Sequence, residues 1–224
     1  MSIERRLVER EIKLVIARPG DVVKPMWFLI LVISMVPLAL TPGSIVLPEI
    51  GSAMIWISVL LALLLNTDHM FSNDFEDGVL EQYLFINRPL EWLVSLKLLS
   101  HWIFQVVPLI LIAPIAAIML SVDSRLVYAL VLTLFVATPA LTCFTGLGAA
   151  LTLGVSRSGV LGVLVMMPLF VPVIILSAGI LMRAMDGSEM LPLVALLGAF
   201  SIASAMLIPF AVAAALRLNI GDSN

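Results

Sequence analysis

Long blocks without any charged residue dominate this sequence. They run over residues 25–48, 50–67, 102–122, 126–156, 158–182 and 190–216. A run of about 18 or more apolar residues is long enough to cross the hydrocarbon core of a bilayer. The blocks do not alternate between apolar and polar residues with a period of two, so they indicate helices rather than the strands of a membrane barrel.

We therefore predict an all-α membrane protein with six transmembrane helices, and we treat residues 1–224 as a single transmembrane domain. The expected spans are about 25–40, 50–65, 92–120, 126–153, 160–182 and 191–216. The composition agrees, because 62% of the residues are hydrophobic and only 12% are charged, against roughly 25% charged in soluble domains.

The basic residues predict the orientation, because Lys and Arg concentrate in short cytoplasmic loops. If the N-terminus is cytoplasmic, ten of the twelve basic residues lie on or near that side, and only Arg125 and Arg183 do not. We expect both termini to be cytoplasmic and the protein to lie in a bacterial inner membrane. The stretch before the first span is charged throughout, so we expect no cleaved secretory signal.

Residues 2–18 have helical periodicity, with Arg6, Arg10 and Lys13 forming a basic stripe. This pattern predicts a helix along the inner membrane face, with its basic groups among anionic headgroups. Two glutamates interrupt the apolar side, and we interpret them as contacts to protein rather than to lipid. Pro19 and Gly20 are expected to end the helix.

The longest polar segment, residues 66–88, is predicted to contain a short cytoplasmic helix at about 74–86. Asn73 is suited to cap its start, and the residue before Pro89 disfavours helix. Its apolar residues recur every four positions, with two leucines adjacent, namely Phe71, Phe75, Val79, Tyr83, Leu80 and Leu84. Its acids line another side, namely Asp74, Asp77 and Glu81.

Two interpretations of this helix remain open, and they are compatible. It can dock into a groove of a cytoplasmic partner that carries Arg or Lys. Alternatively, its apolar side packs on the protein's own helix ends, and its acids are simply solvated.

The sequence of this region closely resembles a known family. The run 71–82, FSNDFEDGVLEQ, and the run 97–102, KLLSHW, are similar to haem exporter protein B of the bacterial cytochrome c maturation system. Further similarities are Thr138-Pro139 and the run 209–217, PFAVAAALR. The resemblance implies that the ATPase-coupling residues are Phe71, Asp74, Phe75, Asp77, Gly78, Leu80, Glu81 and Gln82.

The resemblance also implies an ABC-2-like membrane subunit that acts as a dimer with two copies of a cognate ATPase. Its other expected partners are a haem-handling membrane protein, a small membrane protein, a periplasmic haem chaperone and membrane lipids. Haem is a possible substrate, and ATP is expected only through the partner, because the sequence has no G-x-x-x-x-G-K-[ST] phosphate loop. The formal charge of −3 gives no reason to expect a nucleic acid.

Three polar residues in the third span, Lys97, His101 and Gln105, recur every four positions. Ionisable residues within a span are functional candidates, and a histidine can ligate haem iron. We favour a structural role, because Lys97 lies near the interface and His101 can bond a neighbouring helix. The single cysteine, Cys143, permits neither an intrachain disulfide nor a cysteine metal site, and we expect no metal site and no catalytic residue.

Other functions remain as alternatives. An ABC-2 permease for a lipid or glycan would have the same architecture. An intramembrane enzyme is disfavoured because no H-E-x-x-H is present, and a secondary transporter because no acid lies at mid-membrane. The sequence leaves open whether haem passes through this subunit or whether ATP hydrolysis releases a haem-loaded chaperone.

Overall fold

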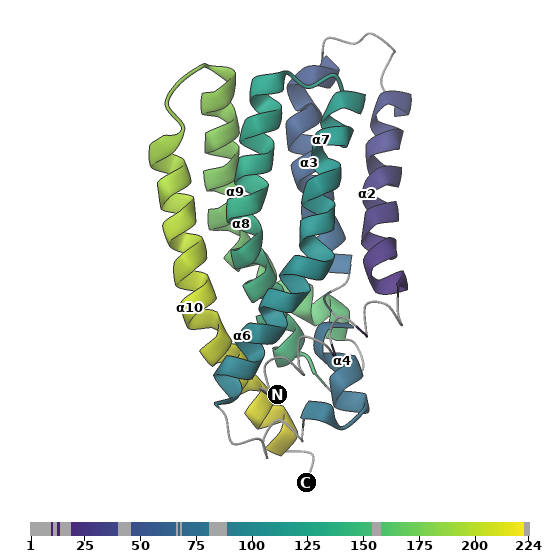
Figure 1. Cartoon of the computed structure of the whole chain (residues 1–224), viewed down its shortest axis with the longest axis vertical. Coiled ribbons are helices and arrows are strands. Elements are labelled where there is room, and N and C mark those ends of the chain that lie inside the picture. Colours follow the sequence, from purple (N-terminus) through teal and green to yellow (C-terminus); the bar gives the residue numbers. More distant parts are fainter. Residues whose placement is uncertain are drawn as a thin grey trace.

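The protein is a bundle of long helices that run side by side (Figure 1). This computed structural model describes residues 10, 13, 19–39, 46–65, 67, 69–80, 89–153 and 158–221. Six stretches within these residues are long and apolar enough to cross a membrane, which confirms the predicted all-α class. The predicted interfacial helix, apart from Arg10 and Lys13, lies outside the described residues, as does the 154–157 segment.

Five of the six spans are single helices. They are α2 (Gly20–Ala39), α3 (Val46–Leu65), α8 (Ser124–Leu151), α9 (Ser158–Met185) and α10 (Leu191–Gly221). The third span is continuous through three segments, α6 (Leu90–His101), the π-helical η1 (Trp102–Val106) and α7 (Val107–Met119). Several helices extend beyond the predicted ranges, because the absence of charge marks the hydrocarbon region, whereas helices continue into the polar interface.

The π-helical segment η1 is a feature that the sequence analysis did not predict. Its wider turn is defined by the Val107 N–H, which donates to the Trp102 carbonyl five residues earlier. Pro108 follows directly and has no N–H to donate to the preceding turn. Single π-helical turns inside α-helices are frequent at functional sites.

Helix α8 is the centre of the bundle. It packs along α9 and α10 and also contacts α3, α4, α6 and α7. Small residues, including Gly146 and Gly148, allow this close approach, as is common between helices in lipid. Three of its buried threonines, Thr133, Thr142 and Thr145, donate to carbonyls of their own helix; for example, Thr142 Oγ1 lies 2.8 Å from the Thr138 carbonyl oxygen. These hydroxyls are therefore satisfied within α8, as expected for residues that serve helix packing.

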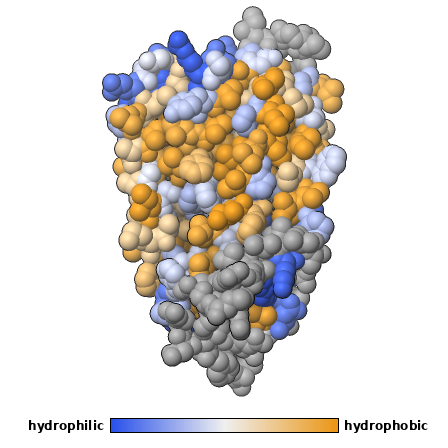
Figure 2. All heavy atoms as spheres, in the orientation of Figure 1, coloured by the Kyte–Doolittle hydropathy of each residue, from blue (hydrophilic) through white to orange (hydrophobic). Residues whose placement is uncertain are grey.

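The surface of the bundle is apolar over its middle. Figure 2 shows hydrophobic side chains across the central part of one face and hydrophilic ones near its upper edge. Large apolar side chains point outward from several spans, and Leu38 and Ile118 are 84% and 75% exposed. Such a largely apolar surface is suited to lipid rather than to water.

The two ends of the bundle differ. One end, which we call the α4 end, holds the short helix α4 (His69–Glu76), the start of α6 and the last turns of α8 and α10 (Figure 1). The opposite end has short turns between α7 and α8 and between α9 and α10. Asp123 begins α8 there, because its Oδ1 accepts a hydrogen bond from the Arg125 N–H at 2.8 Å.

The contact between α8 and α9 generates a prediction about stability. A Cβ atom on Gly148 would lie 2.0 Å from Met166 Cε and 2.7 Å from Met166 Cγ. We expect Gly148→Ala to lower the free energy of unfolding by about 1–3 kcal/mol, because an overpacked interface must move apart. The measurement is thermal unfolding in mild detergent.

Gly198→Ala is the matched control. Its Cβ would meet Val136 Cγ1 at an ordinary 3.7 Å, and alanine favours helix over glycine by about 1 kcal/mol. Equal losses of stability in the two variants would contradict the tight α8–α9 contact.

Candidate functional site

Helix α4 is the short helix of the predicted cytoplasmic segment, but its bounds differ from the expected 74–86. It begins at His69 and ends at Glu76, so the predicted start with Asn73 as a cap is wrong. Gly78 adopts a φ of 68°, a left-handed conformation that glycine accepts without strain and that ends helices. Val79 and Leu80 are again helical, and residues 81–88 lie outside the described part of the chain.

The apolar side of α4 packs on the protein's own helix ends. Met70, Phe71 and Leu80 are buried in a cluster with residues of α6, α8 and α10. A Cβ on Gly146 of α8 would lie 3.3 Å from the Met70 sulfur, so the two helices are in close contact. Hydrophobic burial therefore holds α4 against the end of the bundle, as one of the two interpretations expected.

On the acidic side of α4, Asp74 is buried rather than solvated, unlike the exposed Asp77. Asp74 is 2% exposed and lies between two basic side chains. Lys97 Nζ of α6 donates to Asp74 Oδ2, and Arg10 Nη2 donates to Asp74 Oδ1 at 2.6 Å. The sequence interpretation missed this pairing because the three residues are far apart along the chain.

We call Arg10, Asp74 and Lys97 the buried charge cluster. Lys97 is only 9% exposed, and its Nζ lies 5.7 Å from the centre of the Phe71 ring, within the range of a cation–π contact. A charge in such surroundings is costly unless it is paired. The carboxylate between two cations meets this requirement, and it ties α4 and the Arg10 segment to α6.

A second ion pair joins the neighbouring helix ends. Arg217 Nη2 of α10 donates to Glu91 Oε1 of α6 at 2.8 Å, and the Arg217 side chain is 50% exposed. Asn219 Nδ2 donates to the Ala150 carbonyl oxygen of α8 at 2.9 Å. The ends of α6, α8 and α10 are thus linked around α4, although an exposed ion pair contributes little to stability.

The other predicted coupling residues take different positions. Asp77 is exposed in the turn after α4, and Phe75 is partly buried. Gly78 forms the left-handed turn, and Leu80 is buried. Glu81 and Gln82 lie outside the described residues.

The three polar residues of the third span lie in different segments. Lys97 of α6 pairs with Asp74, His101 ends α6, and Gln105 lies within η1. Their role stays a prediction. In the described residues no group of three or more His, Cys, Asp or Glu side chains is arranged to hold a metal ion.

Arg10, Glu91 and Arg217 are residues whose pairing the sequence interpretation missed. Arg10 was expected among lipid headgroups. The sequence did contain a signal for the pairing of Lys97. This residue is a cation within the third span, and charged residues in a span usually pair with a group of opposite charge. The sequence could not tell which acid of the 66–91 region supplies it.

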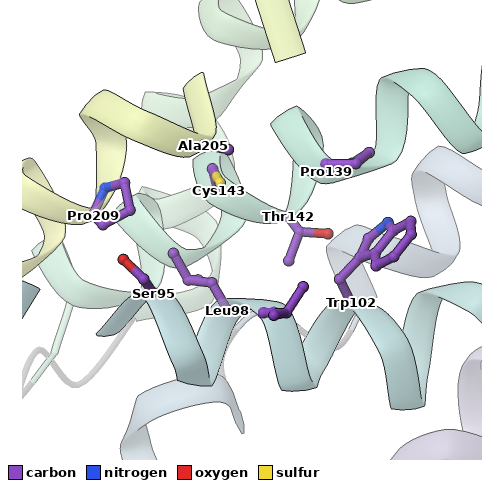
Figure 3. A pocket seen from close by; sticks show the side chains of 9 residues that line it. Ser95, Leu98, Trp102, Pro139, Thr142, Cys143, Ala205 and Pro209 are labelled. Atoms are coloured by element: carbon purple, nitrogen blue, oxygen red, sulfur yellow. The ribbon is translucent and has the colours of Figure 1, made fainter. Parts of the chain in front are cut away.

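An apolar groove lies beside the cluster, between α6, α8 and α10 (Figure 3). It has a volume of about 160 Å³ and is lined by Ser95, Leu98, Leu99, Trp102, Pro139, Thr142, Cys143, Ala205 and Pro209. The polar groups at its wall are bonded within the protein, for example Trp102 Nε1, which donates to Thr138 Oγ1 at 2.9 Å. Ligand pockets usually exceed about 300 Å³, and His101 is not among the residues that line this groove.

Comparison with known proteins places the chain among named relatives. The model of the family described as CcmB protein matches residues 2–219. Heme exporter protein B of Haemophilus influenzae is 38% identical over 216 residues, which cover 96% of this chain and 98% of the relative. The proteins of that name from Pseudomonas aeruginosa and Escherichia coli K12 are 37% and 35% identical, and the matches cover 96% of this chain and 97% and 98% of those relatives.

The buried charge cluster generates a stability prediction. Asp74→Asn leaves Lys97 and Arg10 beside each other without the carboxylate, and breaking a buried ion pair in this way typically costs about 3–5 kcal/mol. We expect a correspondingly lower midpoint of thermal unfolding in detergent. Asp77→Asn removes an exposed carboxylate three residues away and is expected to leave the midpoint unchanged. Similar midpoints for the two variants would show that Asp74 is not paired as described.

Proposed function

The chain belongs to the CcmB protein family, and from this membership we propose that it is the membrane-spanning subunit of an ATP-dependent complex for haem export in cytochrome c assembly. The observation that carries the proposal is the match over nearly the whole chain to relatives named Heme exporter protein B. The six apolar spans supply the architecture that such a subunit needs.

The energy for export comes from a separate ATPase subunit. The sequence contains no phosphate-binding loop of the form G-x-x-x-x-G-K-[ST], which would let the chain grip nucleotide phosphates. This subunit is therefore non-catalytic, and ATP acts on it through the partner. The alternative of an ABC-2 permease for a lipid or glycan is disfavoured by the names of the full-length relatives.

The ATPase subunit docks at the α4 end. Asp74 is used internally by Lys97 and Arg10, so the exposed Asp77 forms the contact, together with Glu81 and Gln82 as the family resemblance implies. An acidic turn beside a partly buried aromatic, Phe75, is suited to a groove with a basic rim. The apolar side of α4 fixes this surface to the bundle and is not itself the docking face.

The protein lies in a bacterial inner membrane with its α4 end in the cytoplasm. Lys97 and Arg217 are at this end, whereas Arg125 and Arg183 are at the opposite end. Together with the basic residues before α2, this distribution follows the positive-inside rule. An ATPase can reach α4 only in this orientation.

Haem delivery takes place in a larger assembly. The subunit forms a homodimer and works beside a haem-handling membrane protein, a small membrane protein and a periplasmic haem chaperone. ATP hydrolysis by the partner drives a rearrangement of the spans that either transfers haem or releases the haem-loaded chaperone.

The docking surface predicts the effect of charge reversal. Asp77→Lys combined with Glu81→Lys replaces two acids by bases, and we expect the ATPase subunit to dissociate because like charges then face each other. The measurement is co-purification of the ATPase in mild detergent, with equal amounts of the membrane subunit.

Asp186→Lys is the matched control, since Asp186 is an exposed acid at the opposite end. Retention of the ATPase by this control is expected. Undiminished retention by the Asp77 and Glu81 double variant would refute the docking surface.

The orientation is tested by thiol labelling in a Cys143→Ala background. We expect a membrane-impermeant maleimide added to spheroplasts to label the Ser188→Cys variant, because Ser188 is exposed at the opposite end. The Asp77→Cys variant should react only after the membrane is permeabilised. The reverse pattern would place α4 in the periplasm, where no ATPase can reach it.

A further inference from the structure

The buried charge cluster connects two elements that would otherwise be held by apolar contacts alone. Phe71 and Met70 are already buried against the bundle, so hydrophobic burial is sufficient to keep α4 in place. An ion pair in such surroundings adds little net stability compared with apolar residues of similar size. Its distinctive contribution is to fix one orientation of α4 relative to α6 by directed hydrogen bonds.

The cluster is placed where α4 meets the span that contains the π-helical turn. Lys97 lies in α6, four residues before His101 ends that helix, and η1 begins at the next residue. Arg10 binds the second oxygen of the same carboxylate. A displacement of α4 therefore acts on the α6 half of the third span through the bond between Lys97 Nζ and Asp74 Oδ2.

The π-helical segment η1 is the point in the third span where the regular hydrogen bonding changes. The Val107 N–H bonds five residues back rather than four, and Pro108 cannot donate to the turn before it. Trp102, the first residue of η1, is held to α8 by its hydrogen bond to Thr138. It also makes an edge-on contact with Phe135 of α8, with ring centres 5.4 Å apart. Bending is easiest at such an interruption of the helical ladder.

We propose that Asp74 and Lys97 are positioning residues that make α4 and α6 move as one rigid unit, and that η1 is the hinge at which this unit turns against α7. The proposal rests on the proposed function, because it names the path by which motion of the docked ATPase enters the membrane. The coupling is carried by one directed contact and one defined flexible point.

Distances between spin labels test the rigid unit directly. In a Cys143→Ala background, the pair Ser72→Cys and Trp92→Cys reports on α4 against α6. The pair Trp92→Cys and Ile118→Cys spans η1, and Trp92 and Ile118 are both exposed. The complex is measured with its ATPase subunit, without nucleotide and with ATP plus vanadate.

We expect the distance across η1 to change with nucleotide, whereas the distance between α4 and α6 stays constant. Adding Lys97→Met should make the α4–α6 distance broad or dependent on nucleotide. An α4–α6 distance that changes as much as the distance across η1 in the unmodified cluster would overturn the proposal, and so would a constant distance across η1.

Activity measurements separate positioning from simple loss of structure. Lys97→Arg keeps the charge and should retain cytochrome c maturation, whereas Lys97→Met should lower maturation per ATP hydrolysed by about tenfold, within the usual range of coupling between sites. The ATPase subunit should still co-purify with Lys97→Met. Exchange of the two residues, Asp74→Lys with Lys97→Asp, restores an attractive pair between α4 and α6, and it should recover only part of the lost coupling, because Arg10 then lies beside a lysine.

These outcomes separate a failure of the proposed function from a failure of the positioning role of Asp74 and Lys97. If the ATPase is absent from the unmodified complex, the proposed function fails. If the ATPase binds and Lys97→Met matures cytochrome c with unchanged coupling, only the positioning role fails. If Lys97→Met does not accumulate in the membrane, the comparison of Lys97→Arg with the exchanged pair decides, and equal loss in both would overturn the proposal.

Discussion

A single buried carboxylate determines how the α4 end of this protein is organised. Asp74 is a buried residue of α4, and it accepts hydrogen bonds from Lys97 of α6 and from Arg10. Parts of the chain that are far apart in the sequence therefore meet at its two oxygens. A charge removed from water must be paired where it is buried. Because both cations approach the same side chain, α4 has one orientation against α6, and the surface exposed at the α4 end is set accordingly.

The rest of the bundle is held by a different kind of contact. In lipid there is no water to drive helices together, so close packing at small residues and satisfied hydroxyls hold the spans. Helix α8 has these features along its length, with glycines facing Met166 and Leu98 and threonines bonded within the helix. The centre of the bundle is thus held by close packing of small and apolar residues, whereas the α4 end is held in addition by pairs of charged side chains.

The third span joins these two regions. Its first half, α6, is tied to α4 and to α10 by ion pairs, and its second half, α7, packs among α2, α3 and α8. The π-helical η1 lies between them and is attached to α8 through Trp102. Helix α4 therefore reaches the bundle in two ways, directly through its contact with α8 and through the ion pair that links it to α6.

The sequence by itself determined the class of this protein. Six charge-free blocks require six spans because lipid excludes unpaired charges and open backbone, and the run 71–82 carried the resemblance to its family. The sequence could not assign partners to charges, since Asp74, Asp77 and Glu81 are equivalent in a helical pattern. Only the tertiary structure decided that Asp74 faces Lys97 and Arg10 while Asp77 is exposed. Long-range pairing and the π-helical turn depend on how distant segments pack, and local periodicity does not contain that information.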